Sequence, residues 1–133
     1  MPLLEKTLAF NEARQRMLAE NIANVSTPGY RARQLDASAF QRALRDASER
    51  RTARGGSFEL ERTDQFRTEP DGRLVVTPTE APAENTLFKD GTNASIERQM
   101  SQLAEVTILH QMTTELYKNY VDGLTKAIRG RVV

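Results

Sequence analysis

The sequence predicts a mainly α-helical fold, in which N-terminal and C-terminal helices pack as an antiparallel coiled coil and a short loop-rich and β-rich segment lies between them. Two observations predict the helices: at both ends of the chain, side chains of one face recur at alternating steps of about four and three residues. A third observation concerns the middle, where prolines and glycines interrupt helical patterns. The chain has 133 residues, so we expect residues 1–133 to form a single domain.

The N-terminal helix is expected over residues 3–24. Its seam, meaning the row of side chains on one face, is apolar at its ends and polar in its middle: Leu4, Leu8, Asn11, Gln15, Leu18, Ile22 and Val25. Polar seam residues cost stability but can fix the register of two helices. The helix should end near Asn24, because Pro28 disfavours helical backbone at Thr27. Pro28 and Gly29 fit the central positions of a type II turn, since glycine accepts the positive φ required there.

The C-terminal helix is the stronger pattern and is expected over residues 95–129. Its seam repeats the same spacing: Ile96, Met100, Leu103, Thr107, His110, Thr114, Tyr117, Val121, Leu124 and Ile128. A second apolar row follows a neighbouring face: Val106, Leu109, Met112, Leu116 and Tyr120. Ser95 is a suitable N-cap and Gly130 a suitable stop. Such a helix is about 50 Å long, so the shorter N-terminal helix cannot cover both rows, and the lone chain should leave apolar surface exposed.

Matching polar middle with polar middle sets an antiparallel register for the two seams, because buried polar groups need hydrogen-bond partners. Each end of the N-terminal helix then has two expected neighbours: Leu18 and Ile22 approach Met100 and Leu103, while Leu4 and Leu8 approach Tyr117 and Val121.

The middle segment, residues 25–92, is expected to begin with one short helix near residues 37–49. Phe40, Leu44 and Ala47 would form its apolar face. Asp36 or Ser38 could cap its N-terminus. Residues 50–57, which are rich in arginine and contain two adjacent glycines near their end, read as a charged loop.

The rest of the middle segment favours at most three short strands. Residues 58–61 alternate apolar and polar side chains, and residues 74–77 form a short β-type run. Asp71 and Gly72 mark a turn. Residues 79–92 read as an extended linker.

The residue inventory argues against a catalytic, cofactor-binding or metal site. The chain has no cysteine, which excludes disulfides, thiolate metal sites and cysteine nucleophiles. The one histidine, His110, lies on a helical seam and reads as a packed polar residue, since a zinc site needs three or four converging ligands. No apolar run reaches the roughly 18 residues of a membrane span, and the N-terminal residues do not form the apolar core of a cleavable secretory signal.

Two alternative functions stay open. A small periplasmic glycan hydrolase would need a carboxylate pair, and five acids are scattered through the loop-rich region: Asp64, Glu69, Asp71, Glu80 and Glu84. A small basic nucleic-acid-binding helical protein would use a cluster of arginines: Arg42, Arg45, Arg50, Arg51 and Arg54. Nothing fixes the separation of the acids, and the arginines lack interleaved aromatic residues for stacking bases. The net charge of +1 gives no general reason to expect a nucleic acid, so we expect neither a nucleic acid nor a small-molecule substrate.

Three stretches resemble the bacterial flagellar axial family, which covers rod, hook and hook–filament junction proteins. The first, residues 18–32, contains the segments LAENIAN and TPGYRA; the second, residues 90–100, reads DGTNASIERQM; the third, residues 124–130, reads LTKAIRG. Ser95 stands where the family usually has an acidic cap. The chain lacks the large inserted β domains of distal members, and so is most similar to the proximal-rod components.

The resemblance implies a single rod-type domain with a structural role and no enzymatic activity. It implies export by the flagellar type III apparatus without a cleavable signal peptide, and helical assembly in the periplasmic part of the basal body. The implied role is to connect the MS ring to the distal rod, transmit torque and line the export channel. The implied partners are copies of the chain itself, other rod proteins, the MS ring with its small rod adaptor protein, and the export apparatus.

The residues expected to form the assembly interface lie on the helical seams and in the turn between residues 24 and 30. They are Leu4, Leu8, Leu18, Asn21, Ile22, Asn24, Thr27, Pro28, Gly29, Tyr30, Ile96, Met100, Leu103, Leu109, Leu116, Tyr117, Val121, Leu124 and Ile128.

Overall fold

The computed structural model describes residues 2–82 and 92–130, and this part of the chain is mainly helical with two small antiparallel sheets. Its elements in chain order are α1 (Pro2–Ala23), β1 (Arg33–Gln34), α2 (Ala37–Arg54), β2 (Phe66–Thr68), β3 (Leu74–Val76), β4 (Thr79–Glu80) and α3 (Thr92–Ile128). The prediction of a mainly α-helical fold with a loop-rich and β-rich middle is therefore confirmed.

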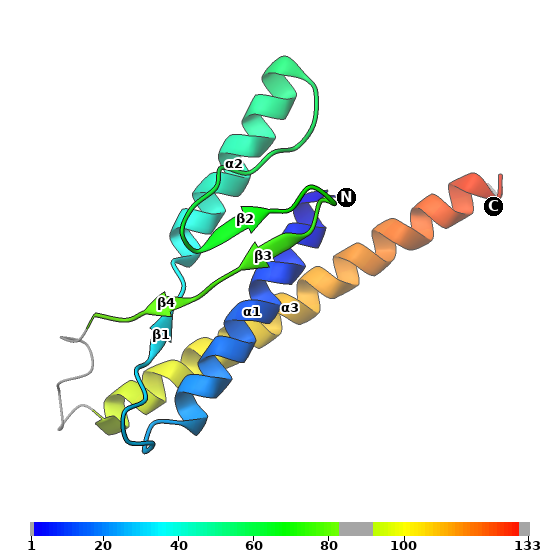
Figure 1. The fold of residues 1–133 in the computed structure, drawn as a ribbon. Coiled ribbons are helices and arrows are strands. Elements are labelled where there is room, and N and C mark those ends of the chain that lie inside the picture. The colour runs from blue at the N-terminus through cyan, green and yellow to red at the C-terminus, as the bar shows by residue number, and fades with distance from the viewer. Residues whose placement is uncertain (1, 83–91, 131–133) are drawn as a thin grey trace.

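Helices α1 and α3 lie side by side and run antiparallel (Figure 1). The Tyr117 hydroxyl donates to the Glu5 carboxylate at 3.1 Å, and the Gln15 amide donates to the Thr107 hydroxyl at 3.0 Å. Glu5 precedes Gln15 along α1, but its partner Tyr117 follows Thr107 along α3, so the two helices run in opposite directions. The antiparallel direction and the polar contact in the middle of the seam agree with the sequence prediction.

The boundaries of α3 differ from the prediction at its start. The helix begins at Thr92, so Ser95 lies within it and the prediction that Ser95 caps the helix is wrong. No proline or glycine separates Thr92 from Ser95, so nothing stops the helix from extending by another turn. At the other end Gly130, with φ of 64°, donates its N–H to the Ala127 carbonyl at 3.1 Å. Gly130 therefore ends the helix as predicted.

Helix α2 is longer than predicted. Asp36 is the N-cap: its Oδ1 accepts the backbone N–H of Ala39 at 3.0 Å. The helix continues through Arg54 and ends where Gly55, with φ of 70°, donates to the Arg51 carbonyl. The prediction that residues 50–57 form a loop is thus wrong for residues 50–54. Their side chains are compatible with a helix, and arginines in the last turn interact favourably with the helix dipole.

The strands form two two-stranded sheets. Strands β2 and β3 pair around a turn in which Gly72 has φ of 90°, as expected for the Asp71–Gly72 pair. Strands β1 and β4 pair with Arg33 opposite Glu80. Two expectations are wrong. Residues 58–61 form no strand, and residues 79–80, which were expected to belong to a linker, form β4. Thr92, the last residue of that expected linker, begins α3, and residues 83–91 lie outside the described part of the chain.

The main core lies where α1, α2 and β2 meet. It is built from Phe10, Phe40 and Phe66, each at most 3% exposed. The Phe10 and Phe40 rings stack with centroids 4.1 Å apart, and the Phe66 ring meets Phe40 edge-on at 5.4 Å. Such aromatic pairs stabilise a core by about 0.5–1.5 kcal/mol beyond the area that they bury. A second cluster of Met17, Leu18 and Val106 joins α1 to α3.

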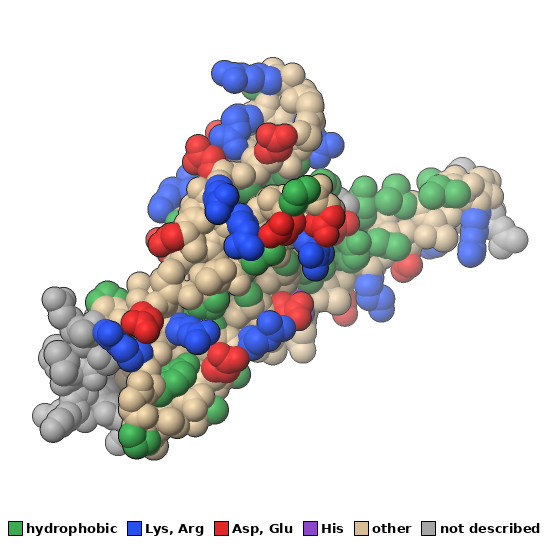
Figure 2. All heavy atoms as spheres, in the orientation of Figure 1, with side chains coloured by type: hydrophobic (Ala, Val, Ile, Leu, Met, Phe, Trp, Pro, Cys, Tyr) green, Lys and Arg blue, Asp and Glu red, His purple; other side chains and the backbone are tan. Residues whose placement is uncertain are grey.

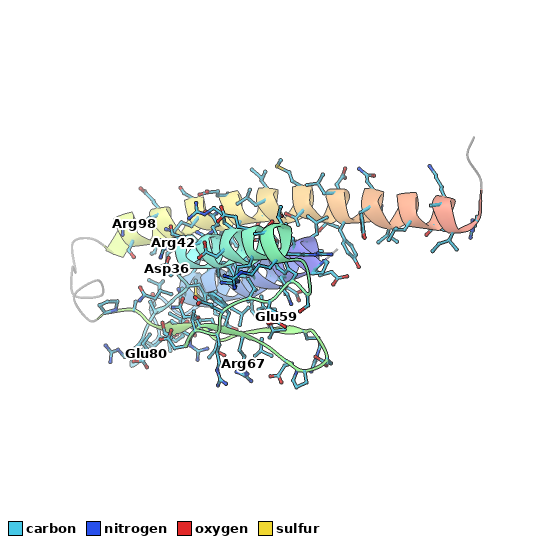
Figure 3. All side chains as sticks on the ribbon, turned by 90° about the horizontal axis from the view of Figure 1, so that it is seen from above. Asp36, Arg42, Glu59, Arg67, Glu80 and Arg98 are labelled. Carbon is cyan, nitrogen blue, oxygen red and sulfur yellow. The ribbon has the colours of Figure 1, made fainter. Side chains whose placement is uncertain are left out.

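In the view from above, α3 lies on one side of the molecule and the strands lie on the other, with α1 between them (Figure 3). Gln65 joins the two sheets and the start of α2. Its amide nitrogen donates to the Thr79 hydroxyl at 2.8 Å and to the Gln34 carbonyl at 3.3 Å, while its oxygen accepts the Asp36 N–H at 2.8 Å.

Candidate functional site

The turn after α1 is held by a buried asparagine. Asn21 is 4% exposed. Its amide nitrogen donates to the Arg33 carbonyl at 2.8 Å, and its oxygen accepts from the Tyr30 hydroxyl at 2.8 Å and from the Arg33 N–H at 3.0 Å. We call this group of contacts the Asn21 clasp. Because it joins the last turn of α1 to the start of β1, it fixes both ends of the intervening loop.

The loop itself carries a second layer of hydrogen bonds. The Asn24 amide donates to the Glu20 carbonyl at 2.9 Å, and the Thr27 hydroxyl donates to Asn24 Oδ1 at 3.2 Å. The Tyr30 N–H donates to the Thr27 carbonyl at 3.2 Å, and Gly29 has φ of 78°. This geometry confirms the predicted turn at Pro28 and Gly29. The turn is both exposed and tightly held, so it presents a defined shape to its surroundings.

The face of α3 that meets α1 lies between the two rows predicted from the sequence. Val106 is fully buried at its centre, and Thr113, on the same face, is 9% exposed. Leu103 packs against the cluster that contains Leu18, as predicted. Met100 and Val121, which were expected to be covered by α1, are 54% and 38% exposed. The sequence pattern marked two neighbouring rows, and α1 covers the boundary between them.

The exposed side of α3 is unusually apolar. Nine large hydrophobic side chains on the described part of this helix are exposed: Met100, Ile108, Leu109, Met112, Leu116, Tyr120, Val121, Leu124 and Ile128. Figure 2 shows hydrophobic side chains gathered along the part of α3 that projects from the body. The expectation that the chain leaves apolar surface exposed is confirmed. Large contiguous apolar surfaces on a protein mark sites of interaction with other proteins or membranes.

The projecting part of α3 lies beyond the N-terminal end of α1. Glu5 of α1 contacts Tyr117, so the antiparallel register places Pro2, the first residue of α1, about level with Tyr120. The residues of α3 that follow Tyr120 extend beyond α1 (Figure 1). The exposed apolar residues at this end of α3 are Tyr120, Val121, Leu124 and Ile128, of which Ile128 is 85% exposed.

The residues predicted for an assembly interface fall into three groups. Leu18 and Asn21 are buried and hold the chain together. Eight are half-buried: Leu4, Leu8, Ile22, Asn24, Tyr30, Ile96, Leu103 and Tyr117. Nine are exposed: Thr27, Pro28, Gly29, Met100, Leu109, Leu116, Val121, Leu124 and Ile128.

Sequence reasoning left three exposed apolar residues of α3 out of that interface. Met112 and Tyr120 belong to the second apolar row, so the periodic pattern carried the signal for them. Ile108 belongs to neither row, and its hydrophobicity alone was the signal.

Three of the acids considered for catalysis each form an ion pair with an arginine. Glu69, Asp71 and Glu80 pair with Arg67, Arg73 and Arg31 at 3.0, 2.8 and 3.4 Å. The backbone N–H and side chain of Arg73 hold the pKa of Asp71 below its ordinary value. Arg67 and Glu80 point outward from the strands (Figure 3), and Glu84 lies outside the described residues. Ion pairs of this kind are typical of a solvated surface.

The buried Nδ1 of His110 has no hydrogen-bond partner in residues 2–82 and 92–130. In those same ranges, no three His, Cys, Asp or Glu residues gather closely enough to hold a metal ion. Nor does any described helix combine the length and the apolar character that crossing a membrane requires. Of the arginines considered for nucleic-acid binding, Arg50 donates a hydrogen bond to the Glu59 carbonyl at 3.0 Å. This bond holds the segment after α2 against that helix.

Comparison with known proteins agrees with the resemblance found in the sequence. The profile of the family described as "Flagella basal body rod protein" matches residues 4–31, which contain most of α1 and its turn. The flagellar basal body rod protein FlgB of Cereibacter sphaeroides is 31% identical over 131 residues, covering 94% of this chain and 90% of the relative. FlgB of Salmonella typhimurium is 26% identical over 133 residues, covering 95% and 90%. FlgB of Bacillus subtilis is 25% identical over 127 residues, covering 96% and 91%.

Proposed function

Since the chain belongs to the FlgB family of flagellar basal body rod proteins, we propose that it is a building block of the proximal rod, where it assembles helically with copies of itself and with other rod proteins. It is a structural protein of the basal body rather than an enzyme. The observation that carries the proposal is the exposed apolar surface of α3, which extends far beyond the reach of α1.

In this role residues 1–133 act as a single rod-type domain, and α1 and α3 pair as an antiparallel coiled coil. The steps of four and three residues along both seams support this pairing. So does the hydrogen bond between Gln15 and Thr107, because a matched polar pair in an apolar seam penalises every register that separates it.

The assembly interface consists of the exposed face of α3 together with the turn after α1. Moving one half-exposed large hydrophobic side chain out of water contributes on the order of 1 kcal/mol. Nine such side chains on α3 therefore contribute roughly as much as the 4–15 kcal/mol that association costs in lost freedom of motion. They point in several directions around the helix, so no single neighbour covers them all. Stable incorporation thus requires neighbours on more than one side, as inside a helical tube.

The family resemblance supplies the rest of the proposal. At the base of the rod the chain connects the MS ring, through a small adaptor protein, to the distal rod. There it transmits torque and contributes to the wall of the export channel. It reaches this place in the periplasmic space through the flagellar type III export apparatus, with which it makes a transient contact.

A complementation experiment tests the proposal. In a strain that lacks its own copy of the gene, the wild-type chain should restore motility and appear in purified basal bodies. Leu116→Glu should be exported but absent from basal bodies, because it places a charge on the apolar face. Leu116 is 57% exposed, so this change leaves the core intact. Gln111→Glu adds the same charge at a position that is already polar, on the side of the helix opposite Leu116, and should incorporate normally. Normal incorporation of Leu116→Glu would contradict the proposal.

A further inference from the structure

Two of the chain's four methionines lie on the outer side of α3, where solvent reaches them. Met112 is 57% exposed and Met100 is 54% exposed, whereas Met17 is 5% exposed. The remaining methionine, Met1, lies outside the described residues. A dissolved oxidant must touch the thioether group to oxidise it, so exposure decides which methionine of a folded chain reacts first. The fold therefore separates two accessible thioethers from a protected one.

Met17 is protected because it belongs to the cluster that joins α1 to α3. It packs there with Leu18, which is 2% exposed, and with Val106, which is fully buried. A dissolved oxidant reaches Met17 only when the two helices separate. Oxidation of Met17 therefore reports opening of the fold, which makes this residue an internal reference for the two exposed methionines.

Met112 lies among other exposed apolar side chains. Ile108 and Leu109 precede it by four and three residues, and Leu116 follows it by four, so all three are its neighbours on the helix surface. They are 57%, 39% and 57% exposed. Oxidation to the sulfoxide turns a flexible apolar side chain into a polar one. A sulfoxide here would interrupt the apolar surface, and any partner that covered it would have to supply a hydrogen bond.

Oxidation of Met112 and Met100 should leave the fold itself in place. In the described part of the chain, the two hydrophobic clusters are built from other residues. An oxygen atom added to a side chain that is more than half exposed stays in contact with water, so it loses no hydration. The modified chain therefore keeps its structure but carries an altered surface.

We propose that Met112 and Met100 are oxidation sites of the unassembled chain, at which peroxides form methionine sulfoxide, and that the sulfoxide at Met112 keeps the chain out of the rod. With hydrogen peroxide, the sulfur lone pair attacks one peroxide oxygen, so an S–O bond forms and the O–O bond breaks. The sulfur loses two electrons and the peroxide gains them. The hydroxide that leaves takes the proton from the transferred oxygen and becomes water. The second half of the inference rests on the proposed function, since it concerns entry into a rod.

Peptide mass spectrometry on the purified full-length chain tests the first half. During brief exposure to hydrogen peroxide, sulfoxide should form at Met112 and Met100 several-fold faster than at Met17. In denaturant the three rates should become similar, because unfolding removes the protection of Met17. Equal rates in the folded chain, or a faster reaction at Met17, would overturn the assignment. So would a loss of helical circular dichroism while Met17 is still unmodified.

Two substitutions test the second half, in cells that lack their own copy of the gene. Met112→Gln places a neutral polar side chain where the sulfoxide would stand. Met112→Leu keeps the side chain apolar, conserves its volume and removes the sulfur. Met112→Gln should be exported but enter basal bodies several-fold less than Met112→Leu. A pulse of peroxide should lower the incorporation of newly made wild-type chains several-fold more than that of Met112→Leu chains, each measured against its own untreated level.

The opposite results distinguish the inference from the proposed function. Equal incorporation of Met112→Gln and Met112→Leu would overturn the second half of the inference and leave the proposed function standing. Equal sensitivity of wild type and Met112→Leu to peroxide would do the same. Wild-type chains that never enter basal bodies would instead refute the proposed function, and the second half with it. The rates measured on the purified chain decide the first half in every case.

Discussion

Replacing Asn21 by alanine should loosen the turn after α1 and destabilise the whole chain. The substitution removes three hydrogen bonds and leaves the Tyr30 hydroxyl and the Arg33 N–H and carbonyl without their partner. A typical protein hydrogen bond contributes about 0.5–1.5 kcal/mol net, and a buried polar group left unsatisfied costs about 1–3 kcal/mol. Water reaches part of this exposed loop, so the lower figures apply and the expected loss is about 2–4 kcal/mol. That is a large share of the roughly 5–15 kcal/mol by which domains are stable.

Denaturant unfolding followed by far-ultraviolet circular dichroism measures this loss as a lower midpoint with an unchanged slope. Tyr30→Phe is the matched control, since it removes one of the three hydrogen bonds and should cost about 1 kcal/mol. Amide exchange should speed up at residues 30–34 in Asn21→Ala more than in Tyr30→Phe. If Asn21→Ala cost no more than Tyr30→Phe, the clasp would not be what organises the turn.

Three further predictions follow from the geometry. Gly29→Val should reduce motility more than His110→Ala, because a β-branched residue at a φ of 78° is strained by on the order of 1–3 kcal/mol; a motile Gly29→Val strain beside an immotile His110→Ala strain would reverse this ranking. The hydrogen bond to Glu5 raises the pKa of Tyr117 above its ordinary value of 10.0, so the stability that this hydrogen bond contributes is complete below pH 10.0 and is lost as the pH rises through the raised pKa. The free energies of unfolding of wild type and Tyr117→Phe should therefore become equal at alkaline pH. A difference between them that stays constant with pH would refute this reasoning. Leu103→Asp should destabilise the chain by about 1.5–3 kcal/mol, because it removes a leucine side chain that packs in the seam and puts a charge there. It should prevent rod incorporation without blocking export, and an unfolding midpoint like that of wild type would contradict it.

The two long helices could be predicted because their signal is local. Seam residues three or four positions apart identify α1 and α3 wherever the helices later pack, and matching the polar middle of one seam with that of the other was enough to predict an antiparallel register. The pattern could not decide which of two adjacent rows on α3 faces α1. Val106 became the centre of the contact because α1 covers the boundary between the rows.

The other elements depend on contacts between residues far apart in the chain. Phe10 lies off the predicted seam and belongs to the core only because Phe40 and Phe66 meet it there. Strand β1 has two residues and exists through its pairing with β4, so no local run of β-type residues announces it. Gln65 reads as an ordinary polar loop residue, although its side chain joins both sheets to α2.

The residues of the candidate site were predicted in outline, but the structure gives some of them a different role from the one expected. The turn at Pro28 and Gly29 follows from the backbone preferences of those two residue types. Asn21 was expected in the interface, but the structure shows it inside, where it shapes the surface that the turn presents. A motif in a sequence does not distinguish a residue that touches a partner from one that supports the residue that does.

The position of α1 between the two hydrophobic clusters determines how force passes through the molecule. α1 contributes Phe10 to the phenylalanine cluster that holds α2 and the β2–β3 hairpin, and it meets α3 through the cluster of Met17, Leu18 and Val106. Leu35, just after β1, packs against both clusters. A shearing load applied along α3 therefore reaches the rest of the described structure chiefly through α1, because α1 belongs to both hydrophobic clusters. The stiffness of the protein under such a load is therefore set by how firmly the two hydrophobic clusters hold this one helix.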